Sequence, residues 1–221
     1  MADFISKSIK LSKNSKRFGY IATTTIPSNS IILIENAKVD LIGENRYYEM
    51  YQILYKILSE PESKIYSKFM NLLPDKYDKY IIDELCDDIY MLPEKMREFF
   101  MNIEPEKLNL YCTKYIRNAF GNENPLLLIH GAMFNHSCNP NVTFIQDKNR
   151  MYFVTVKEIR KGEELMCHYG DITEPKEKRQ KRLLNQYGFI CNCDRCCNKC
   201  VKIQNILDIK YSNPNKYNIF T

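Results

Sequence analysis

The order of hydrophobic and polar residues changes twice along the chain. Residues 19–39 are rich in β-branched side chains on either side of the turn-forming Pro27, Ser28 and Asn29, which predicts two short strands. Between residues 46 and 113 the apolar positions follow helical spacing instead, as in Tyr47, Met50, Tyr51, Leu54 and Leu58. Prolines interrupt this stretch at positions 61, 74, 93 and 105, so we expect several amphipathic helices that together form a helical insertion.

Strand signals return from about Tyr115. The segments "MYFVTV" (151–156) and "EELMCHY" (163–169) are predicted strands, joined by a turn at Lys161 and Gly162, and a final helix is expected near 174–186. We find no internal repeat and no low-complexity linker. The simplest organisation is a main domain over 11–171 that contains the helical insertion (46–113), a helix and cysteine-rich tail over 172–200, and a C-terminal tail over 201–221.

Composition indicates an ordinary globular protein rather than a disordered one. Of the 221 residues, 44% are hydrophobic and 27% are charged, which is typical of soluble domains. No apolar run approaches the roughly 20 residues of a membrane span, and the opening "MADFISKSIK" lacks the apolar core of a signal peptide. We therefore expect an intracellular chain, nuclear or cytoplasmic, with no membrane partner.

The net charge of +5 is mild, and the basic residues gather only in "EPKEKRQKRL" (174–183). A solvated helix face explains this run better than a nucleic-acid site does, so nucleic acid is not implied. A zinc finger that binds nucleic acid through Lys178, Arg179, Lys181 and Arg182 is one alternative function, and it predicts steeply salt-dependent binding.

Five of the nine cysteines fall within "CNCDRCCNKC" (191–200), which is too crowded for a disulfide framework. Such crowding in an intracellular chain is typical of zinc held by thiolates. Cys86, Cys112 and Cys167 stand alone among apolar residues and are interpreted as small buried hydrophobes.

Structural zinc requires four ligands, and the CxCxxC pattern of Cys191, Cys193 and Cys196 supplies three. Cys138 is the preferred fourth ligand, because it would fold the tail back onto a distant part of the chain. Cys197 and Cys200 remain alternatives, although adjacent CxxC pairs leave little slack for closing around one ion.

The stretch "FNHSCNPNVTF" (134–144) places His136 and Cys138 among apolar neighbours. Taken alone, His136 is a candidate zinc ligand, or a base beside a thiol nucleophile. Both interpretations are weak, because residues two apart are poorly placed for a contact between nucleophile and base.

Three motifs in order resemble the SET-domain protein lysine methyltransferases, and within them the SET and MYND domain branch. "FNHSCNPN" (134–141) resembles the NHSCxPN signature, "KGEELMCHYGD" (161–171) the GEExxxxY signature, and "YGFICNCDRC" (187–196) the post-SET tail with its aromatic residues and CxCxxC. The resemblance runs from about Leu11 to Cys196 and is weakest in the helical insertion. It implies a mostly β fold with a helical insertion (α+β): small sheets with pseudoknot-like threading and a zinc-bound post-SET tail.

The resemblance also implies methyl transfer from S-adenosylmethionine to the side-chain amine of a lysine in a protein substrate, histone or non-histone. Tyr169 matches the family's catalytic tyrosine, which aligns the amine. Phe120, Tyr169 and Tyr187 would line the lysine channel. The residues implied to bind the cofactor are Lys16, Arg17, Phe18, Gly19, Asn118, Asn135, His136, Tyr187 and Phe189, and the implied zinc ligands are Cys138, Cys191, Cys193 and Cys196.

The sequence departs from the family pattern in two places. In "KRFGYIA" (16–22) Arg17 stands where the family's first glycine is expected, which places the local cofactor contact in question. The insertion also carries no MYND-type finger, and no helical-repeat domain follows the tail, so docking of partner peptides by such modules is not expected. We expect a monomer, and we retain a non-catalytic SET fold that binds peptide or cofactor as a further alternative.

Overall fold

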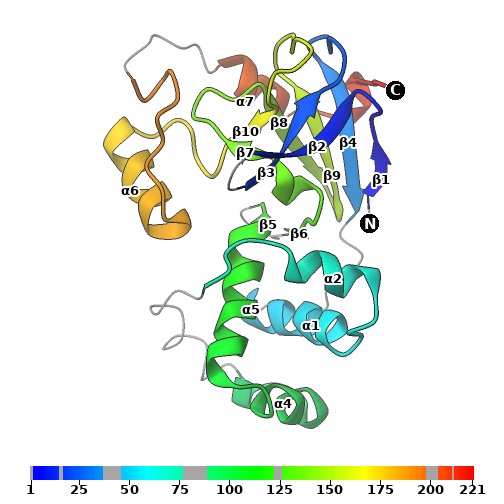
Figure 1. Ribbon diagram of the computed structural model, residues 1–221, viewed down its shortest axis with the longest axis vertical. Coiled ribbons are helices and arrows are strands. Elements are labelled where there is room, and N and C mark those ends of the chain that lie inside the picture. The colour runs from blue at the N-terminus through cyan, green and yellow to red at the C-terminus, as the bar shows by residue number, and fades with distance from the viewer. Residues whose placement is uncertain are drawn as a thin grey trace. The chain divides into compact units, whose positions relative to one another are not determined.

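The computed structural model describes residues 2–14, 17–36, 46–76, 89–121, 126–197, 204–210 and 212–221. The chain folds into two compact units (Figure 1). Unit 1 combines Met1–Ala37 with His130–Thr221, and unit 2 is the continuous segment Lys38–Ile129. Unit 1 is thus closed by segments that lie far apart in the sequence.

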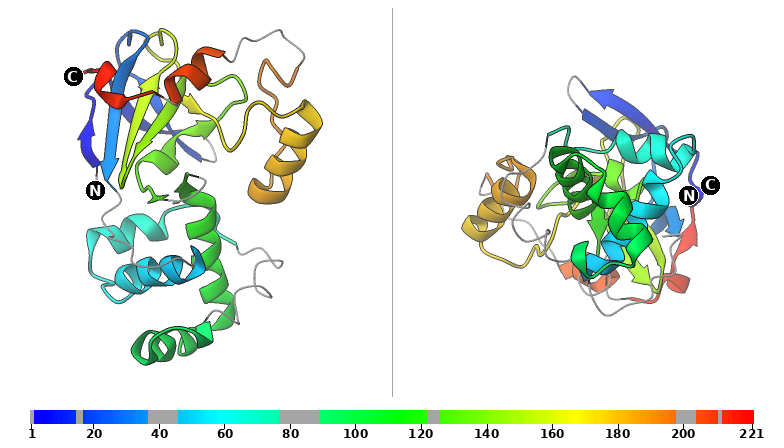
Figure 2. Two further views of the ribbon diagram at one scale, coloured as in Figure 1. Left: turned by 180° about the vertical axis from the view of Figure 1, so that it is seen from behind. Right: turned by 90° about the horizontal axis from the view of Figure 1, so that it is seen from below.

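The main sheet of unit 1 has five strands in the order β1-β4-β9-β8, with β11 also paired to β4. Its strands are β1 (Ala2–Ile5), β4 (Ser30–Asn36), β8 (Val142–Asp147), β9 (Arg150–Thr155) and β11 (Asn218–Ile219). β1 pairs antiparallel with one end of β4 and β11 pairs parallel with the other end, so both strands share the same edge. Both chain ends accordingly lie at this edge when the unit is seen from the front and from behind (Figures 1 and 2).

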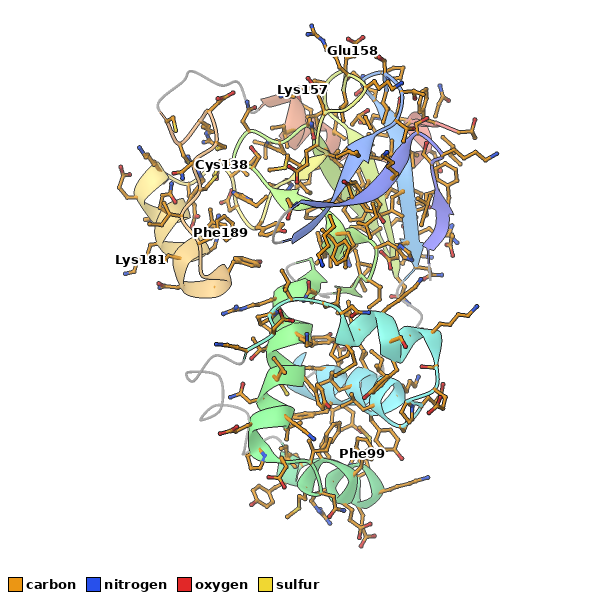
Figure 3. The ribbon with its side chains drawn as sticks, viewed as in Figure 1. Phe99, Cys138, Lys157, Glu158, Lys181 and Phe189 are labelled. Carbon is orange, nitrogen blue, oxygen red and sulfur yellow. The ribbon has the colours of Figure 1, made fainter. Side chains whose placement is uncertain are left out.

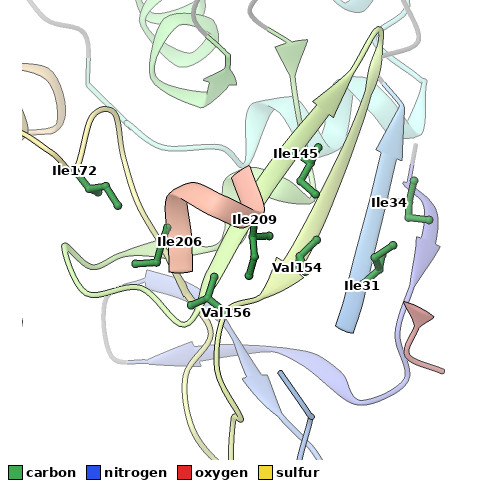
Figure 4. Packing of buried hydrophobic residues seen from close by; sticks show 8 residues of the cluster. All are labelled: Ile31, Ile34, Ile145, Val154, Val156, Ile172, Ile206 and Ile209. Atoms are coloured by element: carbon green, nitrogen blue, oxygen red, sulfur yellow. The ribbon is translucent and has the colours of Figure 1, made fainter. Parts of the chain in front are cut away.

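One face of this sheet is covered by the C-terminal helix α7 (Gln204–Lys210). β-Branched side chains dominate the contact, as expected where apolar residues alternate along strands and pack against a helix. The buried cluster consists of Ile31, Ile34, Ile145, Val154, Val156, Ile172, Ile206 and Ile209 (Figure 4). The C-terminal segment is therefore an integral part of unit 1.

A second group of small sheets in unit 1 carries the predicted motifs. The hairpin of β2 (Ile9–Asn14) and β3 (Arg17–Ala22) is antiparallel, and the two-residue strands β7 (Asn135–His136) and β10 (Met166–Cys167) are parallel. The remaining elements of the unit are the 3-10 turns η1 (Gly131–Met133) and η2 (Pro214–Lys216) and the helix α6 (Lys176–Tyr187).

Unit 2 consists mainly of helices packed through aromatic side chains. They are α1 (Arg46–Leu58), α2 (Lys64–Met70), α4 (Glu94–Met101) and α5 (Pro105–Asn118), with a small hairpin of β5 (Ala119–Phe120) and β6 (Leu126–Leu127). Tyr51 and Phe100 meet edge to face with ring centroids 5.0 Å apart, as do Tyr55 and Phe99 (Phe99 is labelled in Figure 3). Aromatic pairs prefer this geometry and bury large areas, so they account for much of the unit's core.

Most of the predicted elements are present. The two strands around Pro27–Asn29 are β3 and β4, the stretch of helical spacing contains α1, α2, α4 and the first part of α5, the helix near 174–186 is α6, and the strand at 151–156 is β9. Cys112 and Cys167 are fully buried, as predicted, whereas Cys86 lies outside the described residues.

Three expectations were wrong in detail. The return of strand structure at Tyr115 is too early, because α5 continues to Asn118 before β5 begins. The strand expected over 163–169 is reduced to Met166–Cys167. On its N-terminal side Glu164 forms only an isolated bridge with Ile21, and the remaining residues are not in a strand. The tail 201–221 contributes α7 and β11, which we had not predicted.

None of the helices within the described residues is both long enough and apolar enough to cross a lipid bilayer.

Candidate active site and metal centre

The "NHSC" and "GEE" motifs meet through parallel pairing of β7 with β10. Met166 pairs with Asn135 and Cys167 with His136, and the Ser137 amide donates to the Cys167 carbonyl at 2.8 Å. Asn141 fastens the pair: its side chain donates to the Glu164 carbonyl (2.8 Å) and accepts from the Met166 amide (2.7 Å). A buried amide with both donor and acceptor satisfied rigidifies its surroundings, so the chain leading to Tyr169 is held beside β7.

Tyr169 emerges immediately after β10. Its hydroxyl donates to the Phe134 carbonyl at 2.8 Å, and its backbone amide donates to His136 Nδ1 at 3.0 Å. The two contacts fix both ends of the residue against the β7 segment. The phenol is therefore held in one orientation, and its oxygen lone pairs can accept a hydrogen bond from a bound group.

His136 links Tyr169 to the cysteines. Because Nδ1 accepts from the Tyr169 amide, Nε2 carries the ring hydrogen, and Nε2 lies 3.3 Å from Cys138 Sγ. Burial, with His168, Arg182 and Arg179 nearby, lowers the pKa of His136 to about 3, so the ring is neutral. Both nitrogens are engaged within the chain, which leaves the backbone of His136, rather than its ring, for the predicted cofactor contact.

Two further aromatic rings surround Tyr169. Helix α6 ends at Tyr187 and is capped by Gly188, whose φ of 73° is the left-handed conformation that favours glycine at a helix C-terminus. This turn directs Tyr187 and Phe189 toward Tyr169, with ring centroids 4.8 Å and 6.4 Å from that of Tyr169. Phe189 also lies 5.8 Å from the His136 ring. The predicted post-SET aromatics and the predicted catalytic tyrosine thus share one cluster.

The sulfur atoms of Cys138, Cys191, Cys193 and Cys196 all lie within 4.8 Å of one another. Cys138 Sγ is 4.0 Å from Cys191 Sγ and 3.5 Å from Cys196 Sγ. A tetrahedron with zinc–sulfur bonds of about 2.3 Å has sulfur–sulfur edges of about 3.8 Å, so these four residues fit a zinc ion. Cys138 is the member that comes from outside the tail, and it is fully buried.

Burial also affects the protonation of these thiols. It raises the pKa of Cys138 above its ordinary value and that of Cys191 to about 11, whereas hydrogen bonds offset burial at Cys193 and lower its pKa to about 7. Near neutral pH Cys138 and Cys191 remain largely protonated without a cation, and a divalent ion would shift them to thiolates. The donor set is therefore suited to a metal rather than to nucleophilic chemistry.

The tail backbone is positioned by Gln180 of α6, whose side-chain amide donates to the Cys191 carbonyl (2.6 Å) and accepts from the Cys191 amide (2.9 Å). Cys197 is exposed and its thiol faces the Asn192 carbonyl at 3.5 Å, outside the four-sulfur cluster. Cys200 lies outside the described residues.

Gly19 explains how β3 approaches this site. A Cβ at Gly19 would lie 2.5 Å from Asn135 Nδ2 and 2.7 Å from Glu164 Oε1, so any side chain would displace these groups. Asn135 Nδ2 donates to the Phe18 carbonyl (3.0 Å) and to Glu164 Oε1 (2.6 Å). The Asn135 side chain therefore joins β3 to the "GEE" segment.

The other residues of the predicted cofactor stretch are less informative. Phe18 is 43% exposed, and the Lys13 ammonium lies 5.5 Å from its ring centre, a cation–π distance. Arg17 begins β3, and Lys16 lies outside the described residues.

Asn118 and Phe120 belong to unit 2. The Asn118 side chain donates to the Lys114 carbonyl (2.7 Å) within α5 and to the Leu73 carbonyl (2.6 Å) in the segment that follows α2. Phe120 is half-buried in β5. Their predicted roles in binding cofactor and lysine stay predictions.

Several residues that hold the site together were not among the predicted site residues. Asn141 and Glu164 both lie inside quoted motifs, and an asparagine or carboxylate within an apolar segment is itself a signal of a buried hydrogen-bond network. Arg179, which was considered only in the nucleic-acid alternative, and Arg195 adjoin the cysteines. Neither gave a comparable signal, because arginines on helices and loops are usually solvated.

This fold and these motifs define a SET domain. The family profile described as SET domain matches residues 17–170, and the chain belongs to this family of methyltransferases.

A viral relative covers most of the chain. The sequence is 38% identical over 190 residues to the putative SET domain-containing protein L678 of Acanthamoeba polyphaga mimivirus, covering 82% of this chain and 74% of the relative. It is 47% identical over 64 residues to the SET domain and MYND-type zinc finger protein 6 of Schizosaccharomyces pombe, and 40% identical over 65 residues to the histone-lysine N-methyltransferase SMYD3 of Mus musculus. These two matches cover 29% of this chain and only 13% and 15% of the relatives.

Solved structures share the fold. Rubisco LSMT bound to sinefungin and monomethyllysine is 15% identical, with a TM-score of 0.63 over 86% of this chain and 53% of that chain. The SET domain of LSMT bound to methyllysine and AdoHcy gives a TM-score of 0.64 at the same identity. At this level of identity the comparison concerns architecture alone.

Proposed function

We propose that the chain transfers a methyl group from S-adenosylmethionine to a lysine side chain of a protein substrate, with Tyr169 as the catalytic residue. The observation that carries the proposal is the Tyr169 cluster. One hydroxyl, anchored to the Phe134 carbonyl, lies among the rings of His136, Tyr187 and Phe189 at the meeting point of the three family motifs.

The chemistry requires a neutral amine. A lysine amine with a pKa of about 10.4 is mostly protonated near neutral pH and must lose a proton before it attacks. Its lone pair then forms the new C–N bond as the C–S bond of the sulfonium breaks and sulfur keeps the bonding pair. Apolar rings around the amine favour its neutral form, because they exclude the water that stabilises the charged one.

In this proposal Tyr169 aligns the amine. Its hydroxyl hydrogen is committed to the Phe134 carbonyl. A phenolic oxygen that donates one hydrogen bond can also accept one, here from an N–H of the incoming amine. An amine held by such a bond presents its lone pair in a fixed direction, and most of the rate gain would come from this positioning.

The four cysteines are proposed to bind structural zinc. Cys138 follows β7 by two residues and Cys191 follows Phe189 by two, so one ion would hold the tail rings against the β7 segment. Asn135, the backbone of His136, Gly19 and Phe18 are retained as proposed cofactor contacts, and with them Lys16, Arg17 and Asn118. Phe120 and Tyr187 are retained as proposed walls of the lysine channel.

The test is methyl transfer from isotopically labelled S-adenosylmethionine to a lysate or a lysine-rich protein mixture, comparing wild type with Tyr169→Phe. We expect the variant to lose at least about 100-fold in turnover, because an unaligned amine forfeits most of the positional gain. Tyr152→Phe, at a half-buried tyrosine of β9 that packs against the main-sheet cluster rather than against Tyr169, is the matched control and should keep the wild-type rate. Mass spectrometry of the labelled proteins identifies the modified residue.

Each alternative has its own outcome. Binding of labelled cofactor by wild type without transfer to any protein would indicate a non-catalytic SET fold. Equal transfer by wild type and Tyr169→Phe would remove Tyr169 from the mechanism. Steeply salt-dependent binding to DNA or RNA, lost on charge reversal in α6, would favour the nucleic-acid alternative.

A further inference from the structure

Arg179 is a buried cation that forms no ion pair with a carboxylate among the described residues. Only 3% of the residue is exposed, whereas Lys178 and Lys181 of the same helix, α6, are exposed. Within the described part of the chain its guanidinium donates to the Glu174 carbonyl and to Cys196 Sγ at 3.8 Å, while its Nε lacks a hydrogen-bond partner. A buried charge is costly unless an opposite charge lies nearby.

Arg195 approaches the same cluster from the tail. Its guanidinium donates to the carbonyls of Cys138 (3.3 Å) and Ile172 (2.6 Å), and no ion pair joins it to a carboxylate among the residues that the structure describes. Both guanidinium groups therefore adjoin the cysteine cluster, Arg179 through Cys196 Sγ and Arg195 through the Cys138 carbonyl. Two like charges gathered at one site require an anion there.

The cysteine cluster is the group that can supply this anion. Four neutral thiols carry no charge, and a disulfide carries none either. Four thiolates around one divalent ion leave two net negative charges, and two guanidinium groups balance them.

We propose that Arg179 and Arg195 form a cationic outer shell that neutralises a zinc tetrathiolate made by Cys138, Cys191, Cys193 and Cys196. They act as positioning residues: they retain the ion and protect its thiolates from electrophiles. The inference rests on the zinc site of the proposed function and goes beyond it, because it assigns a role to two residues outside the ligand set.

The test measures zinc directly rather than enzyme activity. Full-length wild type, Arg179→Met and Arg195→Met are purified, zinc per chain is measured by atomic emission, and release to an excess of a coloured chelator is followed over time. Methionine keeps much of the side-chain length without the charge. We expect release about 10- to 100-fold faster in each variant, the range typical for loss of a residue that supports metal ligands.

A control lies on the same helix. Lys181 is exposed, and Figure 3 shows it on the outer side of α6, away from Cys138. Lys181→Met removes the same charge from the chain and should release zinc at the wild-type rate. Arg179→Lys separates charge from shape: retention of slow release supports a role for charge, and fast release supports a role for the guanidinium contacts to sulfur.

Cysteine alkylation gives a second measurement. Timed treatment with iodoacetamide, read by mass spectrometry at Cys191, Cys193 and Cys196, should label both methionine variants faster than wild type, with exposed Cys197 as the internal standard. If Arg179→Met does not fold, Arg195→Met, in a partly exposed loop, carries the test.

The outcomes separate this inference from the function. Zinc retained equally by wild type and both variants overturns the inference and leaves the proposed methyl transfer standing. Wild type that binds no zinc overturns the zinc site and the inference together. Fast release in the variants, in a protein that never methylates lysine, supports the inference and rejects the function.

Discussion

The two units differ in the contacts that stabilise each of them internally. In unit 2 one continuous segment folds into helices that pack through neighbouring aromatics such as Tyr55, Phe99 and Phe100. In unit 1 the decisive contacts join residues 117 positions apart (Asn135 with Phe18) and 53 positions apart (Cys138 with Cys191). Long-range contacts cost more chain entropy to close, so each one must be supported by strong local interactions.

The candidate site lies among these long-range closures. Parallel pairing of β7 with β10, the Asn135 side chain and the four sulfurs each bring one motif to another. Loss of one of these long-range contacts should therefore reduce zinc binding, cofactor binding or methyl transfer. Loss of one packing residue in unit 2 should reduce stability alone. The four predictions below test this contrast, from the largest expected effect to the smallest.

Removal of one metal ligand should have the largest effect. In Cys138→Ser the hydroxyl is a poor replacement for a thiolate, and structural zinc sites contribute on the order of 10 kcal/mol to the folding of what they organise. We expect loss of bound zinc, proteolytic cleavage of the tail after Tyr187, and loss of cofactor binding in calorimetric titration. Treatment of wild type with a strong chelator should reproduce all three changes.

The control is Cys197→Ser, since that thiol is exposed and outside the cluster. Cofactor affinity that survives in zinc-free Cys138→Ser would contradict the idea that the ion positions Tyr187 and Phe189.

A cavity in the core of unit 2 should lower the free energy of unfolding by less, and it should leave the zinc site of unit 1 unchanged. Phe100 is fully buried, and truncation of such a side chain to alanine costs about 3–5 kcal/mol. Phe100→Ala should lower the thermal unfolding midpoint of unit 2 while zinc content stays at the wild-type value. Met91→Ala, at a residue that is 81% exposed, should change the stability by no more than about 0.5 kcal/mol. Simultaneous loss of zinc in Phe100→Ala would mean that the two units unfold as one.

A single methyl group tests the packing between β3 and the "GEE" segment. In Gly19→Ala the new Cβ would lie 2.5 Å from Asn135 Nδ2, so the two elements must separate, at a cost of about 1–3 kcal/mol. Urea unfolding measures this cost, and a double-mutant cycle with Asn135→Ala should recover part of it. Strictly additive effects would show that the two side chains do not compete for the same space.

The sequence predicted the parts of the molecule that have local signals. Helical spacing in residues such as Met50, Tyr51 and Leu54 identified α1, and β-branched runs on either side of Pro27 identified β3 and β4. The cysteine spacing and three motifs led to the SET family, which the family comparison confirmed. These features depend on residues that are close together in the chain.

What could not be predicted depends on pairing across the chain. β10 has only two residues because the segment around it changes partner, from β3 at Leu165 to β7 at Met166, and no local pattern encodes such a change. β11 is similarly short and polar in part, and it exists because the edge of β4 is open to it. Burial of Arg179 depends on the cluster beside it, which α6 alone does not reveal.

The smallest effect concerns acid, and it should again fall on unit 1, since all three histidines lie there and residues 38–129 contain none. His168 is buried: its Nδ1 donates to the Gly170 carbonyl (3.0 Å), its Nε2 accepts from Thr143 Oγ1 (3.2 Å), and its ring stacks on Phe144. Burial, with Lys210 nearby, lowers its pKa to about 4. The unfolded chain, with a histidine pKa of about 6.5, therefore binds the proton first, and the stability that His168 provides above that pH is lost as the pH falls toward 4.

Between about pH 7.5 and about pH 5.5 this histidine alone should lower the free energy of unfolding by roughly 1 kcal/mol. Urea unfolding at the two pH values, followed in wild type and His168→Gln, measures the difference. Glutamine keeps a donor and an acceptor but does not titrate, so the variant should lose part of the pH dependence even if it is less stable throughout. If the free energy of unfolding of His168→Gln changes with pH as much as that of wild type, another group causes the acid sensitivity. If the pH dependence belongs to the unfolding of unit 2, the two units do not differ in this respect.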